Sequence, residues 1–248
     1  MKRNYWEKIA PSYNEEIFDV LQNDKKGLIR EAIVKIASPR KSVLDIGCAI
    51  GKWLPVLAPL FKKVIAVDIS AKNLAIARSL NPQFNNIAYL RADMSDTSTR
   101  LPLSEAGICI NAILTPSQKD RAVFFKALSS CIRKKGHIIL TIPSLESYLL
   151  TQIIAHQWKI DADLLNKKIS GKQALSKWKN IQQGNADIDG VPHKHYLKEE
   201  LELLLVKEKF ALVDLKKIEY DWTTEFIKPP RWLKEPRPWD WMVVAQKL

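Results

Sequence analysis

The strongest constraint on the fold is an apolar segment, residues 42–46, that leads directly into two closely spaced glycines, Gly47 and Gly51. A second apolar segment, residues 64–67, follows a short helical pattern and ends in a carboxylate, Asp68. Strand, glycine turn, helix and strand form the first half of a nucleotide-binding crossover unit, in which an acid about twenty residues beyond the glycines can hold ribose hydroxyls. The chain is therefore predicted to be an α/β protein built on a parallel sheet.

The details of the glycine turn distinguish between cofactors. The dinucleotide pattern needs glycine at its third and sixth positions, where this chain has Ala49 and Lys52. Asp45 lies two residues before Gly47, and an acid beside such a turn suits an amino-acid ammonium and a sugar better than a pyrophosphate. The turn resembles the S-adenosylmethionine-binding motif of class I methyltransferases, and the resemblance implies that cofactor. Ala49 replaces the family's usual central glycine and is expected to have a negative φ angle, which tolerates its methyl group.

The resemblance covers nearly the whole chain and implies the family's doubly wound fold. That fold is a seven-stranded, mostly parallel sheet with an antiparallel last strand and helices on both faces. Apolar segments place the strands at residues 42–47, 64–68, 86–91, 107–114, 136–142, 211–222 and 241–247. At 248 residues the chain is long enough for one such domain with additions, and too short for two.

The predicted single domain, residues 1–248, divides into four segments. Residues 1–40 show helical spacing and are expected to form amino-terminal lid helices, and residues 41–143 form the cofactor-binding core. Residues 144–198 are rich in lysine and interrupt the alternation of strands and helices, so they are predicted to be a helical cap inserted after the fifth strand, with a polar loop at residues 184–190. Residues 199–248 contain the last helix and the closing strands.

The resemblance also implies the cofactor contacts, position by position. Gly47 and Gly51 would let the backbone approach the methionine moiety, and Asp45 would balance its ammonium group. Asp68 would accept both ribose hydroxyls, and Asp93 would accept from the adenine amino group. The full set of cofactor-binding candidates is Asp45, Gly47, Cys48, Gly51, Asp68, Ile69, Asp93, Met94 and Asn111. Plain structural roles compete with these: capping of strand ends and turns for the aspartates, and satisfaction of buried backbone for the asparagine.

Methyl transfer from a sulfonium depends mainly on aligning nucleophile, methyl and sulfur, and it needs a general base only when the nucleophile is protonated. His195 and Asn111 are the catalytic candidates. His195 is the first choice as a base, although packing of its loop against the sheet is the more ordinary role for such a histidine. The substrate-side candidates are Tyr5, Trp6, Tyr13, Thr115, Tyr196 and Trp222.

The formal charge of +12 raises the question of an anionic partner. A small-molecule acceptor, anionic or aromatic, is the leading prediction, because the cap would enclose it. Methylation of RNA or another nucleic acid is the second, but residues 112–114 lack the Pro-Pro-aromatic loop that stacks a flipped base. A non-catalytic S-adenosylmethionine-binding partner protein is the third. The Pro- and Trp-rich residues 223–240 would line an aromatic pocket or a dimer contact.

Other classes of protein are not expected. Three cysteines without paired spacing indicate reduced thiols in a cytoplasmic protein, and no metal-ligand spacing is present. No apolar run approaches the roughly 18 residues that a membrane-spanning helix requires, and the first residues contain no apolar signal-peptide core.

Overall fold

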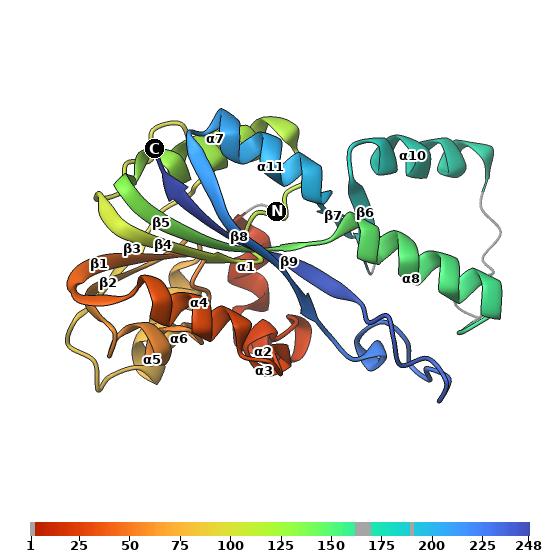
Figure 1. Cartoon of the computed structure of the whole chain (residues 1–248), viewed down its shortest axis with the longest axis horizontal. Helices are drawn as coiled ribbons and strands as arrows, with labels where there is room; N and C mark the ends of the chain where they lie inside the picture. Colours follow the sequence, from red (N-terminus) through yellow and green to blue (C-terminus); the bar gives the residue numbers. More distant parts are fainter. Residues whose placement is uncertain (1–2, 162–169, 189–190) are drawn as a thin grey trace.

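A computed structural model of the chain describes residues 3–161, 170–188 and 191–248. Seven of its strands form one sheet in the order β3-β2-β1-β4-β5-β9-β8 (Figure 1). These strands are β1 (Ser38–Ile46), β2 (Phe61–Asp68), β3 (Ile87–Arg91), β4 (Ser104–Ile110), β5 (Ile132–Pro143), β8 (Phe210–Glu219) and β9 (Trp239–Lys247). β1 to β5 pair in parallel, and β9 is antiparallel to both of its neighbours, β5 and β8. The predicted sheet with its antiparallel last strand is confirmed.

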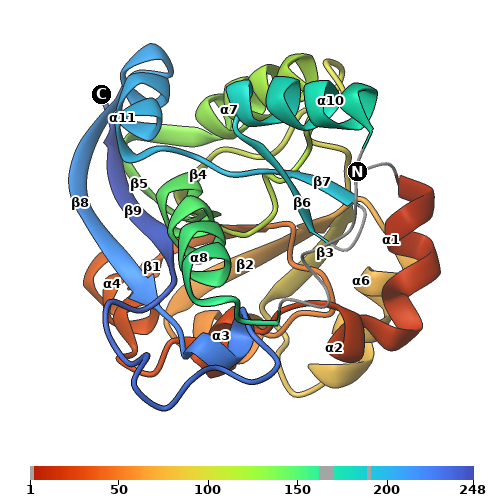
Figure 2. The same ribbon diagram turned by 90° about the vertical axis from the view of Figure 1, so that its right-hand side faces the viewer.

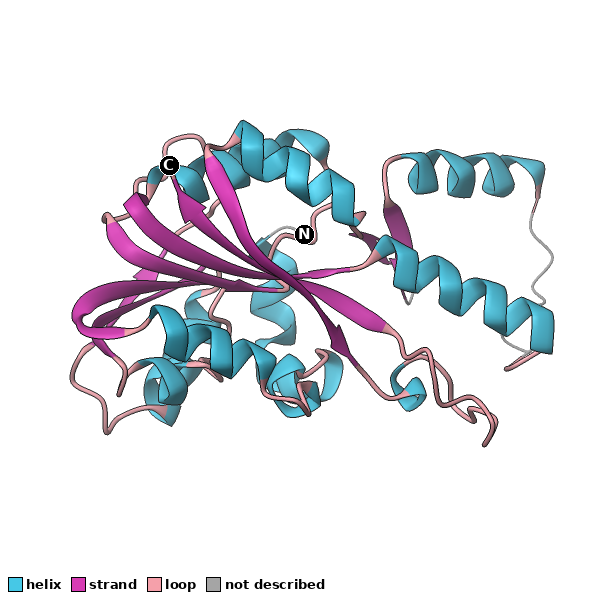
Figure 3. Ribbon diagram, viewed as in Figure 1, coloured by secondary structure: helices cyan, strands magenta, loops and turns pink. Residues whose placement is uncertain are grey.

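Helices cover both faces of the sheet (Figure 3). α4 (Leu28–Ile36), α5 (Leu54–Leu57) and α6 (Ala71–Leu80) lie on one face, and α7 (Gln118–Ser130) and α11 (Lys198–Lys207) lie on the other. Each set of helices contributes buried side chains to its own apolar core. Because both faces are covered, β2 and β4 are buried along almost their whole length, as the apolar segments predicted.

The order of the strands creates a crevice at their carboxyl edge. β1 is paired with β2 on one side and with β4 on the other, so the connections that leave β1 and β4 turn to opposite faces. In open α/β sheets this switch point is where ligands bind. The register places Asp45 of β1 beside Ile108 of β4, and Ile46 beside Val67 of β2.

The amino-terminal helices α1 (Arg3–Ile9), α2 (Tyr13–Glu16) and α3 (Val20–Asn23) are short, and a 3₁₀ turn at Ala10–Ser12 joins the first two. α1 is held at the start of α6 by one side chain, Glu7. Its carboxylate accepts hydrogen bonds from the backbone N–H groups of Ala71 (2.9 Å) and Lys72 (3.2 Å) and from the Ser70 hydroxyl (3.1 Å). A carboxylate at this position satisfies free N–H groups of the helix and complements its dipole.

Between β5 and α11 the chain forms the predicted insertion, with α8 (Leu145–Trp158), α10 (Gly171–Gln182), β6 (Asn185–Ile188) and β7 (Val191–Lys194). Figure 2, which looks onto the carboxyl edge of the sheet, shows α8 and the β6–β7 hairpin in front of the strands. The prediction of a polar loop at residues 184–190 is wrong for residues 185–188, which form β6, and residues 189–190 lie outside the described residues. β6 and β7 pair as antiparallel strands, so their backbone N–H and C=O groups bond each other.

Two strands are shorter than the apolar patterns predicted. β4 ends at Ile110 rather than Leu114, because Asn111 has a φ of 47°, which a strand cannot accommodate. β8 ends at Glu219, and Trp222 begins a 3₁₀ turn, Trp222–Thr224. Among the described helices none is both long enough and apolar enough to cross a membrane.

Candidate cofactor and active site

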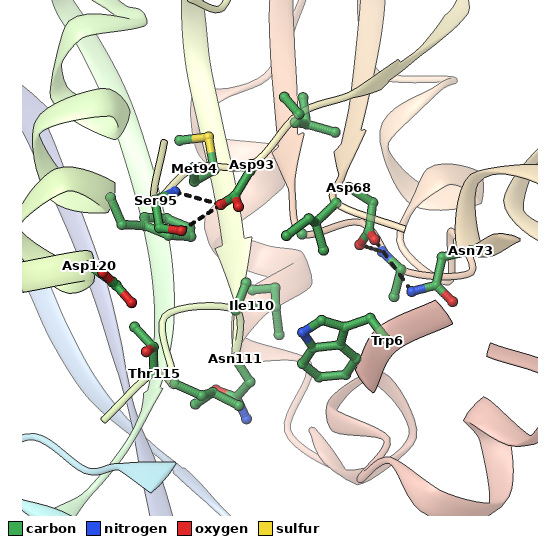
Figure 4. Close-up of a pocket in the computed structure, with 18 of the residues that line it drawn as sticks. Trp6, Asp68, Asn73, Asp93, Met94, Ser95, Ile110, Asn111, Thr115 and Asp120 are labelled. Atoms are coloured by element: carbon green, nitrogen blue, oxygen red, sulfur yellow. Dashed lines mark hydrogen bonds between the residues drawn. The ribbon is translucent and has the colours of Figure 1, made fainter. Parts of the chain in front are cut away.

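A cavity opens at the carboxyl edge of the sheet, where the connections after β1, β2, β3 and β4 meet α1 and α2 (Figure 4). Many of the predicted site residues line it. They are Gly47, Asp68, Ile69, Asp93, Met94 and Asn111 from the predicted cofactor set, and Trp6, Tyr13 and Thr115 from the predicted substrate side. The structure thus brings together residues from both ends of a 110-residue stretch of sequence.

The turn after β1 is held in a left-handed conformation. Gly47 and Gly51 have φ angles of 74° and 80°, values that favour glycine. The expectation for Ala49 is wrong: its φ is 48°, not negative. The strain is compensated locally, because the N–H of Ala49 donates to Oδ2 of Asp68 over 2.9 Å. The turn that exposes the backbone is therefore tied to the carboxylate at the end of β2.

Asp68 is 7% exposed and accepts three hydrogen bonds within the protein. Besides Ala49, its partners are the N–H of Ser70 at 2.8 Å and the side-chain amide of Asn73 at 3.4 Å. Burial raises the pKa of Asp68, and these donors partly offset that shift. The bonds fix the orientation of the carboxylate at the wall of the cavity.

Asp45 lies beneath the turn and not on the cavity wall. It is 2% exposed, and among the described residues its Oδ2 has no hydrogen-bond partner. Burial, and then the negative charge of Asp68, raise the pKa of Asp45 to about 7. A buried carboxylate with an unsatisfied oxygen and no cation is costly, and a positive group near the turn would relieve that cost.

Asp93, after β3, combines two of the roles considered for it. Its Oδ1 accepts from the N–H of Ser95 at 2.8 Å and from the Ser95 hydroxyl at 2.6 Å, so it caps the turn that follows. The same carboxylate lines the cavity next to Met94, which is 5% exposed (Figure 4). Capping orients Asp93 without removing it from the cavity.

Asn111 is oriented by a residue that the sequence did not point to, Asp240 at the start of β9. The amide nitrogen of Asn111 donates to Oδ2 of Asp240 over 2.9 Å, and the hydroxyl of Tyr220 donates to the same oxygen over 2.9 Å. A carboxylate accepts from the nitrogen side of an amide, so the pair determines which way the amide faces. The Asn111 oxygen is left buried without a partner among the described residues. Asp240 is buried, and burial raises its pKa.

The amino-terminal helices close one side of the cavity with Trp6 and Tyr13. Burial, and then the charge of Asp68, raise the pKa of Tyr13, so its hydroxyl stays protonated. Tyr5 does not line the cavity but contacts the Trp6 ring edge-on at a centroid distance of 5.2 Å. Glu7, which anchors α1, was not predicted; no pattern in the sequence connects it with residues 70–72.

Five other predicted site residues, all within the described part of the chain, do not line the cavity. Cys48 and Gly51 belong to the turn behind it. His195 is 5% exposed, and burial lowers its pKa to about 4, so it is neutral at pH 7. The Tyr196 hydroxyl donates to the carbonyl of Ile113 over 3.1 Å, and Trp222 donates to the carbonyl of Pro236 over 3.1 Å. The last three positions are packed in the interior.

The charges on the cavity wall are of one sign. Among the described residues that line it are three carboxylates, Asp68, Asp93 and Asp120, and no lysine, arginine or histidine. Asp120 was missed in the sequence, although Ser117 caps the start of α7 three residues earlier and the pair resembles a capping box. In a chain of net charge +12, a cavity whose charged lining residues are all acidic is a local feature that favours a cationic ligand.

Comparisons with known proteins agree with this geometry. The sequence pattern of the family described as "Methyltransferase domain" matches residues 43–136. The chain is similar to the probable S-adenosylmethionine-dependent methyltransferase CRG1 of Saccharomyces cerevisiae, with 27% identity over 135 residues. That match covers 53% of this chain and 42% of the yeast protein, so the chain spans less than half of its relative.

Solved structures share the whole fold at low sequence identity. The N-methyltransferase NodS of Bradyrhizobium japonicum, in complex with S-adenosylhomocysteine, superposes with a TM-score of 0.63 and 12% identity, covering 99% of this chain and 97% of NodS. An S-adenosylmethionine-dependent methyltransferase of Methanosarcina mazei superposes with a TM-score of 0.62 and 16% identity. The match covers 88% of this chain and 97% of the Methanosarcina mazei protein. Residues 43–136 thus match the methyltransferase-domain family, and the chain as a whole has the fold of solved S-adenosylmethionine-dependent methyltransferases.

Proposed function

We propose that this chain transfers the methyl group of S-adenosylmethionine to a small-molecule acceptor. The observation that carries the proposal is the acidic cavity at the carboxyl edge of β1, β2 and β4. S-adenosylmethionine carries a positive sulfonium and a positive ammonium, so carboxylates without a competing cation suit it. When bound, it supplies an electrophilic methyl group.

Different residues of the cavity would contact different parts of the cofactor. Asp68, fixed by its backbone donors, would accept the ribose hydroxyls. Ile69, Met94 and Asp93 would form the adenine side of the cavity. Asp45 would stabilise the ammonium through the turn, and its unsatisfied Oδ2 supports this role because that oxygen otherwise has no compensation in the described structure.

Asn111 would face the acceptor. Because Asp240, itself held by the Tyr220 hydroxyl, accepts from the nitrogen side of the amide, the buried amide oxygen is the group left to accept a hydrogen bond from an N–H or O–H nucleophile. Such a bond aligns the nucleophile, which is the main contribution a protein makes to an in-line displacement. His195 is less suited to act as a base, since it is buried away from the cavity.

The cap supports a small acceptor. The N–H of Lys194 in the β6–β7 hairpin donates to the carbonyl of Leu114 over 2.9 Å, and the side-chain amide of Asn185 donates to the carbonyl of Pro116 over 3.4 Å. The hairpin is thereby joined to the loop after β4, which lines the cavity. A hairpin fixed to this loop would narrow the approach to the cavity, which suits a small molecule better than a polymer.

Calorimetric titration with S-adenosylmethionine and S-adenosylhomocysteine tests the cofactor site. We expect micromolar binding by the wild type, a loss of at least tenfold in Asp68→Ala, and no change in the matched control Glu202→Ala, whose carboxylate is on α11 outside the cavity. Equal binding by Asp68→Ala and the wild type would contradict the assigned ribose contact.

Transfer of labelled methyl groups tests the acceptor class. The wild type is incubated with labelled S-adenosylmethionine and either a low-mass metabolite extract or total RNA. Label in a low-mass product that Asn111→Ala fails to form supports the proposal. Label in RNA alone would establish nucleic-acid methylation instead, and cofactor binding without transfer to either pool would favour a non-catalytic binding protein.

A further inference from the structure

Helix α10 of the cap has no buried residue. It is twelve residues long and begins with a capping box, in which the Ser170 hydroxyl accepts from the N–H of Gln173 and the Gln173 side chain accepts from the N–H of Ser170. Figure 1 shows it at the end of the molecule opposite the carboxyl terminus, joined to the body through β6. Most helices of globular proteins are stabilised by packing of an apolar face. We therefore expect α10 to pack against a surface outside this chain.

The apolar residues of α10 nevertheless share one face. Ala174, Leu175, Trp178 and Ile181 follow the spacing of a single helical stripe. Leu175 is 54% exposed and Trp178 is 59% exposed, which are high values for large apolar side chains. Within the described residues, neither belongs to a buried apolar cluster.

Lysines border this stripe on both sides. At 100° per residue, Lys172 and Lys179 project along one edge of the stripe and Lys177 along the other. α10 contains no aspartate or glutamate. An apolar centre with lysines at both edges is the pattern of helices that lie in the interface of an anionic membrane, where the long lysine side chains reach the phosphates.

A second exposed aromatic group lies at the same end of the molecule. Trp158, at the end of α8, and Trp232, in the loop before β9, are 48% and 56% exposed with their rings 5.2 Å apart. Lys159 and Arg231 are their neighbours in sequence. Tryptophan is enriched at the level of lipid headgroups because its ring is both apolar and polar.

We propose that α10 docks this chain on an anionic phospholipid surface, with Leu175 and Trp178 inserted between lipids and the three lysines at the headgroups. A second copy of the chain is a poorer occupant, because it would bring the same lysines against each other. Nucleic acid also fits α10 less well than a phospholipid surface does, because it offers phosphates but no apolar partner for the aliphatic residues of the stripe. Docking would present the carboxyl edge of the sheet, which the cap covers, toward the membrane.

Flotation with phospholipid vesicles at physiological ionic strength tests the proposal. We expect the wild type to float with vesicles of equimolar phosphatidylglycerol and phosphatidylcholine, but not with phosphatidylcholine alone, and its tryptophan emission to shift to shorter wavelength. Each lysine near an anionic surface contributes about fivefold to binding, so Lys172→Gln/Lys177→Gln/Lys179→Gln should bind about a hundredfold more weakly. Leu175→Ser/Trp178→Ser should also lose most binding.

The matched control is Lys62→Gln/Lys63→Gln/Lys134→Gln, which removes the same charge from exposed positions on β2 and β5, far from the cap. We expect it to float like the wild type. All variants should keep wild-type circular dichroism and wild-type affinity for S-adenosylhomocysteine, so failure of this proposal is distinguishable from failure of the proposed function.

Four results would overturn the proposal. They are no flotation of the wild type with anionic vesicles, equal loss in the control triple variant, undiminished flotation after the α10 substitutions, and dimerisation in solution that Trp178→Ser abolishes while vesicle binding is absent. Tight binding to single-stranded RNA that requires the α10 lysines, without vesicle binding, would assign the same helix to nucleic acid instead.

Discussion

The buried carboxylate of Asp45 leads to a prediction about stability that needs no substrate. Its pKa in the folded protein is about 7, against an ordinary value of 3.8. Between these values the folded protein holds a proton that the unfolded chain has released, so the unfolding free energy falls as the pH rises through this window and levels off above it. At 1.36 kcal/mol per pKa unit, the complete loss amounts to about 4 kcal/mol.

The substitution Asp45→Asn keeps the shape of the side chain and removes the ionisation. The asparagine has a fixed cost of about 1–3 kcal/mol if its amide protons lack acceptors, but this cost does not depend on pH. The ionisation of Asp45 makes only the wild type depend on pH. From about pH 5 to about pH 8 the unfolding free energy of the wild type should fall by about 2.5 kcal/mol, and this fall should be absent in the variant. The variant should therefore gain stability relative to the wild type as the pH rises.

Urea unfolding followed by tryptophan fluorescence, without ligand and at both pH values, measures the difference. The control is Asp96→Asn, at an exposed carboxylate whose pKa is lowered by hydrogen bonds from the N–H and hydroxyl of Ser98. Because its pKa lies below the ordinary 3.8, Asp96 is ionised in both the folded and the unfolded state at pH 5 and at pH 8, so the difference between the control variant and the wild type should be the same at both pH values. An Asp45→Asn difference that is the same at both pH values would refute the reasoning.

Three further predictions concern the cofactor turn and the helix that closes over it. Binding of S-adenosylmethionine at pH 7 should release about half a proton, because the ammonium lowers the pKa of Asp45; calorimetry in buffers of different ionisation enthalpy detects this, and Asp45→Asn should abolish it. Glu7→Ala removes the anchor of α1 and should weaken S-adenosylhomocysteine binding about tenfold by calorimetry, whereas Glu7→Gln should keep part of it. Ala49→Gly should stabilise the protein by about 0.5–1 kcal/mol in thermal unfolding, because it relieves a positive φ.

The sheet and the cofactor turn could be predicted because their signals are local. The strands from Ser42 to Ile46 and from Val64 to Val67 are buried on both faces and are therefore read as continuous apolar segments. Gly47 and Gly51 mark the turn because only a residue without a side chain adopts their φ angles easily. The same reasoning failed at Ala49, where a hydrogen bond to a carboxylate 19 residues away stabilises an unfavourable backbone angle.

The surroundings of Asn111 and His195 could not be predicted, since their contacts join distant parts of the chain. Asn111 is oriented by Asp240, 129 residues later, and no pattern within either segment indicates the pairing. His195 looks like a base in sequence, but its burial depends on how the β6–β7 hairpin packs against the body. The hairpin has no clear signal in the sequence, because its strands are four residues each, close to the minimum for a recognisable alternation.

The position of β9 has a consequence for how the sheet assembles. Residues 239–247 follow the other six strands of the sheet in sequence, yet they occupy an interior position between β5 and β8. Until β9 is in place, β5 and β8 have unpaired edges, and Asn111 lacks the carboxylate that orients it. Closure of the sheet and orientation of Asn111 are thus one event in folding.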